Sequence, residues 1–290
     1  MRKTAGNAIG ILSAIVLAVN LVFVTTKSEG TADVRVPVIL YHNIVDSLAG
    51  QDLLVSITPD TFRAHMTALK NAGYTGITFD EYYDYVNGGG GLPEKPVIIT
   101  LDDGYLSNYQ YAWPILRSLG MKATIFIVTS TVGASTGVSY PHFTWEQARE
   151  MEQSGVIDIQ SHSHSHEEIP AMDDAAVVRE LRLSKYLIEE NLGKECRYFA
   201  YPYGMYDERA LSAASAAGYR LQCLLGNSGY NTKDTPAEKL RRITVWGDRS
   251  GESLAELVEE TVRGNPFGEP EEIVQEEFVQ DETEESPGSE

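Results

Sequence analysis

Residues 96–104 read PVIITLDDG, an apolar and β-branched run that ends in two adjacent carboxylates and a glycine. A short continuous run of this kind predicts a strand buried in a parallel sheet. Consecutive side chains of an extended chain point to opposite sides, so one carboxylate of Asp102 and Asp103 can bind a metal ion while its neighbour stays free as a base. Taken alone, the same residues also fit a solvated turn.

This run belongs to a pattern that repeats along the chain. Between Val36 and Gly264, short apolar segments alternate with amphipathic stretches that close on glycine, which predicts βα units around a parallel sheet. The number of units favours a (β/α) barrel over an open doubly wound sheet. The expected strands are 37–41, 75–78, 96–101, 123–128, 156–160, 197–201, 220–225 and 242–245. The expected helices are 58–73, 107–120, 144–155, 174–193, 207–218 and 252–264.

Composition narrows the class of protein. The chain has 290 residues, a net charge of -19 and a pI near 4.7. These values disfavour a nucleic-acid partner or an anionic membrane surface, because both require a clustered basic face. No Gly-x-Gly-x-x-Gly follows the first strand, which disfavours a dinucleotide-binding fold. Cys196 and Cys223 need not be bridged in a domain of this size, and the sequence leaves their pairing open.

The two ends of the chain differ from the part between them. Residues 1–27 combine a basic start with an apolar run from Ile9 to Val24, which predicts a secretion signal or a membrane anchor. The run is shorter than the about 20 residues that comfortably span a bilayer. We therefore expect an extracytoplasmic protein, secreted or membrane-anchored, that contacts the membrane only through this segment. Residues 28–35 form a linker, 36–264 the folded domain, and 265–290 an acidic tail expected to be disordered.

Polar clusters follow several of the expected strands. Functional groups gather at the carboxyl ends of the strands in a barrel of parallel strands, so we expect these clusters to meet on one rim. Such clusters stand at 41–43 (Tyr-His-Asn), at 102–104 (Asp-Asp-Gly), at 161–166 (Ser-His-Ser-His-Ser-His) and at 201–204 (Tyr-Pro-Tyr-Gly).

The histidine cluster suggests a metal site. His162 and His166 stand four residues apart, a spacing that a helical turn or a tight loop can bring to one cation. Together with one carboxylate they form a three-ligand site that lowers the pKa of a bound water from about 15.7 toward 7 and polarises a carbonyl. His164 is expected to point elsewhere. An exposed polar loop or an adventitious metal trap would give the same sequence.

Three segments resemble a known family. Residues 100–104 (Thr-Leu-Asp-Asp-Gly), His162-Ser163-x-x-His166 and residues 201–204 are similar, in order and spacing, to the first three motifs of the polysaccharide deacetylases with a NodB-like domain, or carbohydrate esterase family 4. The similarity extends from about Val36 to Leu257. It implies a distorted (β/α)7 barrel that holds a divalent metal ion, usually zinc. It also implies hydrolysis of the N-acetyl groups of GlcNAc units in a polysaccharide, here peptidoglycan or a poly-N-acetylglucosamine exopolysaccharide.

The resemblance also implies residue roles. Asp102 corresponds to the general base, and the metal ligands correspond to Asp103, His162 and His166. The backbone N–H of Tyr203 corresponds to part of the oxyanion hole, where loss of one donor typically costs about 10²- to 10³-fold in rate.

The sequence departs from the family pattern in three places. Ala200 stands where the third motif usually has the Arg that fixes the base, and we expect Arg242 from another strand to replace it. The fourth motif is not visible. No histidine follows His166 to act as the fifth motif's general acid, so we expect His42 to take that role. The Tyr41-His42 start resembles the branch that deacetylates poly-N-acetylglucosamine.

Two other functions fit parts of the pattern. The missing Arg and the unusual acid are compatible with a catalytically silent carbohydrate-binding protein on the same barrel, although the retained carboxylates and histidines favour an enzyme. Two histidines and one carboxylate also occur in iron oxygenases. The βα pattern disfavours that class, whose scaffold is usually all-β.

Overall fold

The computed structural model describes residues 34–136, 138–225 and 229–264. The predicted signal or anchor at 1–27, the linker up to residue 33 and the predicted acidic tail at 265–290 lie outside the described residues. Within the described ranges, no helix has the length and apolar character needed to cross a membrane.

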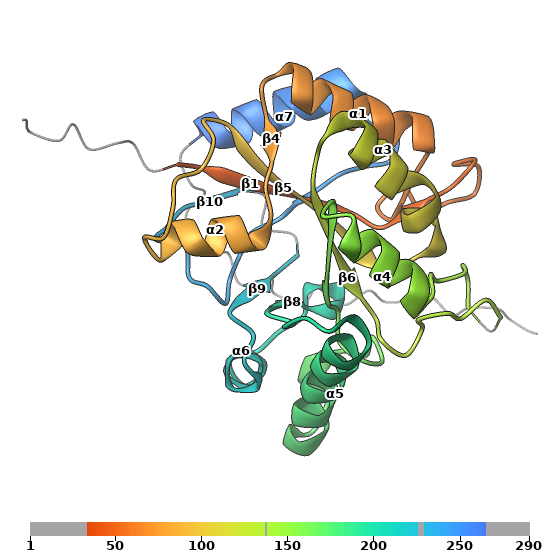
Figure 1. Cartoon of the computed structure of the whole chain (residues 1–290), viewed down its shortest axis with the longest axis vertical. Coiled ribbons are helices and arrows are strands. Elements are labelled where there is room, and N and C mark those ends of the chain that lie inside the picture. The colour runs from red at the N-terminus through yellow and green to blue at the C-terminus, as the bar shows by residue number, and fades with distance from the viewer. Residues whose placement is uncertain (1–33, 137, 226–228, 265–290) are drawn as a thin grey trace, which may run out of the picture. The chain divides into compact units, whose positions relative to one another are not determined.

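Parallel strands form the centre of the folded domain (Figure 1). Each neighbouring pair in this row is parallel. The row runs β1 (Val36–Tyr41), β5 (Pro96–Asp103), β6 (Ala123–Ile127), β7 (Ile157–Ser161), β8 (Tyr198–Ala200) and β9 (Leu221–Cys223).

One further segment joins the two ends of this row. Leu240 forms a parallel bridge with Cys223 of β9, and three residues later β11 (Ile243–Thr244) pairs in parallel with β1. The backbone N–H of Leu224 donates to the carbonyl of Leu240 at 2.9 Å. The strands therefore curl into a distorted (β/α)7 barrel, and the expected fold class is confirmed.

The helices lie outside the strands (Figure 1). Those at the expected positions are α1 (Pro59–Asn71), α3 (Trp113–Leu119), α4 (Trp145–Gln153), α5 (Asp174–Leu192), α6 (Glu208–Ala217) and α7 (Gly251–Arg263). The hydroxyl of Thr58 caps α1, and Thr144 forms the expected capping box with Gln147. The segment expected as one helix at 107–120 divides into a π-helical turn, Asn108–Ala112, and α3.

Several short elements were not expected. The strand predicted at 75–78 ends early, as β4 (Thr75–Gly76), because Thr78 instead forms a capping box with Glu81 and starts α2 (Phe79–Val86). The strands β2 (Asn43–Ile44) and β3 (Ser56–Ile57) pair with each other, and β10 (Tyr230–Asn231) pairs antiparallel with β1. Two-residue strands have no alternation from which to predict them.

Alternate residues of the strands pack into two different apolar clusters. Ile39, Ile99 and their equivalents pack with the surrounding helices, whereas Val38 and Ile98 belong to a second cluster that includes Phe79 and Tyr82 of α2. Asp102 stands four residues after Ile98 in β5 and therefore belongs to the same face of the strand. Both cysteines are buried and free, so no disulfide joins Cys196 to Cys223.

Candidate metal centre and active site

The two carboxylates at the end of β5 converge on one histidine. Oδ2 of Asp102 lies 3.7 Å and Oδ1 of Asp103 lies 3.5 Å from Nε2 of His162. The expectation that they point to opposite sides is wrong, because Asp103 leaves the extended conformation with φ of 74°. Gly104 follows at φ of 80°, and a Cβ there would come within 3.0 Å of the Ile127 side chain. The chain therefore turns sharply at the barrel rim, and at Gly104 the close Ile127 side chain favours a residue without a Cβ.

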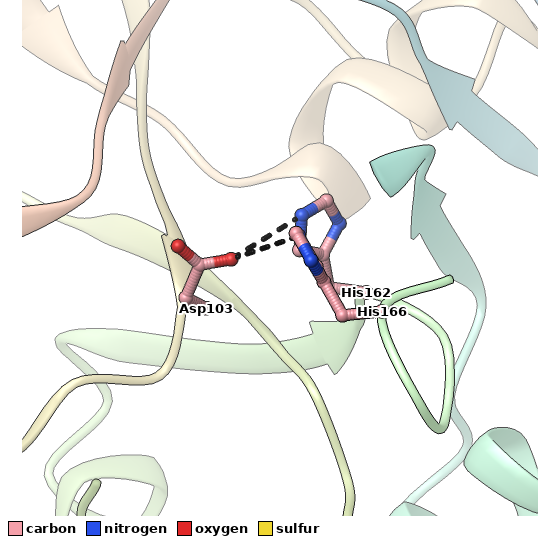
Figure 2. A group of neighbouring side chains, drawn as sticks. All are labelled: Asp103, His162 and His166. Atoms are coloured by element: carbon pink, nitrogen blue, oxygen red, sulfur yellow. Dashed lines mark ion pairs between the residues drawn. The ribbon is translucent and has the colours of Figure 1, made fainter. Parts of the chain in front are cut away.

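A tight loop after β7 returns the second histidine to the first. Ser163 and His166 both have positive φ, at 70° and 62°, and the Ser163 hydroxyl accepts from the His166 N–H at 3.0 Å. The rings of His162 and His166 have centroids 5.0 Å apart. Nε2 of His166 lies 3.3 Å from Oδ1 of Asp103. One ligand atom from each of Asp103, His162 and His166 lies within 4.8 Å of the others (Figure 2).

The chemistry of these three side chains fits a divalent cation. Nδ1 of His162 lies 2.8 Å from the carbonyl oxygen of Ala200, to which it can only donate, so Nε2 presents its lone pair to the cluster. Oδ1 of Asp103 is buried and has no hydrogen-bond partner. Buried lone pairs that converge without a donor are costly unless a cation binds them. Two imidazole nitrogens and one carboxylate oxygen are a ligand set that Zn²⁺ accepts, with a position left for water.

Arg242 reaches Asp102 through the barrel interior. Its Nη1 donates to Oδ1 of Asp102 at 2.8 Å and its Nε donates to the Leu224 carbonyl at 2.8 Å. Both charged side chains are almost fully buried, at 1% and 2% exposure. Burial alone would raise the pKa of Asp102, but the charges of Arg242 and His162 outweigh it and hold this pKa below its usual value. The guanidinium of Arg242, the residue just before β11, thus holds the Asp102 carboxylate.

His42 is close enough to both carboxylates for its charge to influence them. It directly follows β1 and is half-buried, and its Nδ1 is buried without a hydrogen-bond partner. Its charge is among the influences that lower the pKa of Asp102 and of Asp103. The Asn108 side chain donates to the His42 carbonyl at 2.8 Å and so fixes the backbone there.

Tyr203 stands over the second histidine. Its hydroxyl lies 3.2 Å from Nδ1 of His166, and the two ring centroids are 4.6 Å apart. Its own φ is 57°, and its side chain is 56% exposed. Gly204 follows with φ of 68°, where a Cβ would fall 2.2 Å from Cβ of Leu225. The Tyr-Pro-Tyr-Gly segment thus forms a strained turn that packs against Leu225, just after β9. The sequence does not predict that the Tyr203 ring contacts His166.

Other residues support the site without being expected there. Nδ1 of His142 lies 3.2 Å from the carbonyl oxygen of Asp103, and the ring of Tyr105 stacks on His142 at 5.0 Å. The Glu180 carboxylate accepts from the backbone N–H groups of His164 and Ser165, which ties the histidine loop to α5. A glutamate within a helical pattern gives no sequence signal for this contact.

His164 takes no part in the ligand cluster, as expected. Its Nδ1 lies 2.9 Å from the hydroxyl of Thr129. Arg241, the neighbour of Arg242, is half-buried and its backbone bonds with the side chain of Asn231.

Comparisons with known proteins identify the family to which the chain belongs. Residues 89–222 match the family described as Polysaccharide deacetylase. The chain is 34% identical over 233 residues to the putative polysaccharide deacetylase YxkH of Bacillus subtilis, covering 80% of this chain and 78% of that protein. It is 25% identical to the poly-beta-1,6-N-acetyl-D-glucosamine N-deacetylase of Staphylococcus epidermidis, covering 67% and 69% of the two chains.

Solved structures give the same result. The Streptococcus pyogenes deacetylase PplD in complex with acetate is similar at a TM-score of 0.70 and 26% identity, covering 78% of this chain and 98% of that one. IcaB from Ammonifex degensii is similar at a TM-score of 0.67 and 25% identity, covering 78% and 97%. Fold, rim residues and relatives converge, and the chain belongs to the NodB-like polysaccharide deacetylase family.

Proposed function

We propose that this protein is an exported, metal-dependent N-deacetylase that removes acetyl groups from GlcNAc units of a polysaccharide. The observation that carries the proposal is the convergence of Asp103, His162 and His166 beside a buried carboxylate, Asp102, that a guanidinium holds. Export rests on the basic and apolar segment at residues 1–27.

Asp103, His162 and His166 would hold the metal ion, which we propose to be Zn²⁺. The bound ion would supply Lewis acidity, polarising the acetyl carbonyl and lowering the pKa of the attacking water. The Ala200 carbonyl keeps Nε2 of His162 free to act as a ligand by fixing the tautomer of the ring.

Asp102 acts as the general base in this proposal. Arg242 occupies its Oδ1, which leaves Oδ2 on the side of His162 and the ligand cluster. The lowered pKa of Asp102 keeps the carboxylate ionised at neutral pH and able to accept the proton of the attacking water. Because Arg242 is almost fully buried and bonds Leu224 as well, it restricts the carboxylate to one orientation.

His42 delivers a proton to the leaving amine. Its imidazole lies within electrostatic reach of Asp102 and Asp103, and its Nδ1 has no hydrogen-bond partner that would compete with the substrate. The backbone N–H of Tyr203 acts as an oxyanion donor, and the strained turn at Tyr203 and Gly204 fixes its direction. Cleavage of the amide C–N bond then yields acetate and a free amine on the sugar.

The substrate we propose is a polymer that contains GlcNAc, either poly-N-acetylglucosamine or peptidoglycan. The staphylococcal relatives named for poly-beta-1,6-N-acetyl-D-glucosamine support the first of these. They are 25% identical to this chain, so the polymer is best decided by assay.

The test is acetate release by the Zn²⁺-loaded protein from a β-1,6-linked GlcNAc pentamer and from chitopentaose. We expect release from one or both, lost on chelation and restored by Zn²⁺. Binding of the pentamers without acetate release under any metal would overturn the proposal in favour of a catalytically silent carbohydrate-binding protein.

A further inference from the structure

A pocket of about 330 Å³ is lined by residues that neighbour the proposed active site in sequence and in space. Asn43, one of its walls, directly follows His42, and Ser107 of the opposite wall donates to the Asn43 side chain at 2.8 Å. Tyr140, another wall, packs edge-on against Tyr105 with ring centroids 5.9 Å apart. Tyr105 in turn stacks on His142, whose Nδ1 lies 3.2 Å from the Asp103 carbonyl oxygen, so two side chains connect this wall of the pocket to the metal centre.

The lining of this pocket suits a sugar ring. Gln51, Gln110 and Ser47 supply amide and hydroxyl groups, and the rings of Tyr111 and Tyr140 supply flat apolar surface. The volume lies at the lower end of the range for small-molecule pockets, as a single ring requires. Among the described residues that line it, Asp46 is the only charged one. The pocket therefore presents one negative charge and no positive charge of its own.

One hydrogen bond positions the Asp46 carboxylate and leaves its other lone pairs free to accept hydrogen bonds from a ligand. The Tyr111 hydroxyl donates to its Oδ1 at 3.0 Å, and this hydrogen bond raises the pKa of Tyr111, which keeps the tyrosine a donor. An ionised carboxylate has about four lone-pair positions, so one bond from Tyr111 leaves most of them for a ligand. The Asp46 side chain is exposed to solvent at the pocket.

We propose that this pocket is a subsite for a glucosamine unit, that is, a sugar of the same polymer that has already lost its acetyl group. The inference rests on the proposed function. Deacetylation converts a neutral acetamide into an amine that is protonated at neutral pH, and Asp46 recognises this ammonium group by charge. The next GlcNAc unit then lies at the metal centre. Deacetylation consequently proceeds faster beside a unit that is already deacetylated, and free amines accumulate in clusters along the polymer.

The experiment compares two β-1,6-linked pentamers, one fully acetylated and one with a single internal glucosamine. The measured quantity is the ratio of their kcat/KM values in the wild-type holoenzyme, in Asp46→Asn and in Asp60→Asn. Asp60 is the matched control, because its exposed carboxylate at the start of α1 lines a neighbouring pocket that shares Gln110 and Tyr111 but does not line this one. Because an exposed ion pair contributes up to about 1 kcal/mol, removing the Asp46 charge should lower the affinity for the ammonium group by up to about fivefold.

We expect the wild-type ratio to favour the glucosamine-containing pentamer by about two- to fivefold. It should approach one in Asp46→Asn, stay at the wild-type value in Asp60→Asn, and fall as rising pH deprotonates the amine. A wild-type ratio of one, or an equal loss on both pentamers in Asp46→Asn, would overturn the inference.

A binding measurement separates failure of this inference from failure of the proposed function. Calorimetry with the Zn²⁺-loaded Asp102→Asn variant, with and without Asp46→Asn, gives the dissociation constants of both pentamers without turnover. Tighter binding of the glucosamine-containing pentamer that depends on Asp46 supports the subsite even if no acetate is released. Equal binding of the two pentamers rejects the subsite even if the enzyme is active.

Discussion

At the scale of single residues, the buried pair of Arg242 and Asp102 dominates the energetics of the site. We expect Arg242→Ala to lower the free energy of unfolding by about 3–5 kcal/mol, because it leaves a carboxylate buried without its partner. Urea unfolding of the purified variant measures this loss. Arg241→Ala is the control and should change stability by well under half as much.

The double variant Arg242→Met/Asp102→Asn provides a second measurement on the same pair. It removes both charges, so we expect it to recover most of the lost stability while acetate release stays absent. A double variant as unstable as Arg242→Ala would show that the Leu224 contact or the packing, and not the charge pair, supplies the stability.

The proposed acid makes a separate prediction. His42→Ala should lower kcat by about 10²-fold or more with KM nearly unchanged, because general acid–base catalysis contributes about 10²- to 10⁴-fold to the chemical step. Steady-state kinetics on a GlcNAc pentamer measure both constants. A kcat within a factor of two of the wild type would remove His42 from the mechanism.

The sequence predicts the identities of most residues of the site but not their arrangement in space. The motif spacing identifies Asp102, Asp103, His162 and His166, and the absence of arginine at position 200 leads to Arg242. The convergence of the two carboxylates could not be predicted, since it depends on a positive φ at Asp103. Left-handed conformations at residues other than glycine are rare and are imposed by the surrounding structure, so a single sequence does not reveal them.

At the scale of elements, the turn after β8 depends on glycine. Gly204 and Gly193 have nearly the same φ, 68° and 66°, but an added Cβ meets Leu225 only at Gly204 and meets nothing within 4 Å at Gly193. We expect Gly193→Ala to cost about 1–2 kcal/mol for the left-handed backbone alone. Gly204→Ala should cost more and should also lower kcat, because the clash displaces Tyr203.

Thermal unfolding and acetate release of the two glycine variants measure these effects. Equal losses of stability, with full activity in both, would contradict the claim that the turn at Gly204 positions the site.

The elements differ in how well the sequence predicts them. The barrel strands and most helices stand within one or two residues of their expected limits, because apolar runs and glycine stops are local signals. The sequence does not predict α2, because Ile77 and Thr78 continue the β-branched run of β4 and so favour a longer strand. In the structure, the capping box of Thr78 with Glu81 starts a helix there instead. β2, β3 and β10 depend on pairing with distant segments, which no local pattern encodes.

At the scale of the whole molecule, metal binding should be linked to stability. A ligand that binds only the folded state stabilises it by about 2.7 kcal/mol at a concentration 100 times its dissociation constant. We therefore expect a chelator to lower the Tm of the wild-type protein and Zn²⁺ to restore it. Differential scanning calorimetry measures the shift, and Asp103→Asn, which lacks one ligand, should show little response to either addition.

The roles of the two adjacent carboxylates are separated by measuring the zinc content and acetate release of three proteins: wild type, Asp102→Asn and Asp103→Asn. The proposed mechanism assigns Asp103 to the metal and Asp102 to the proton, although both lie within 4 Å of the same nitrogen of His162. It predicts that Asp102→Asn keeps zinc and loses acetate release, whereas Asp103→Asn loses both. Loss of zinc in Asp102→Asn with retention in Asp103→Asn would contradict it.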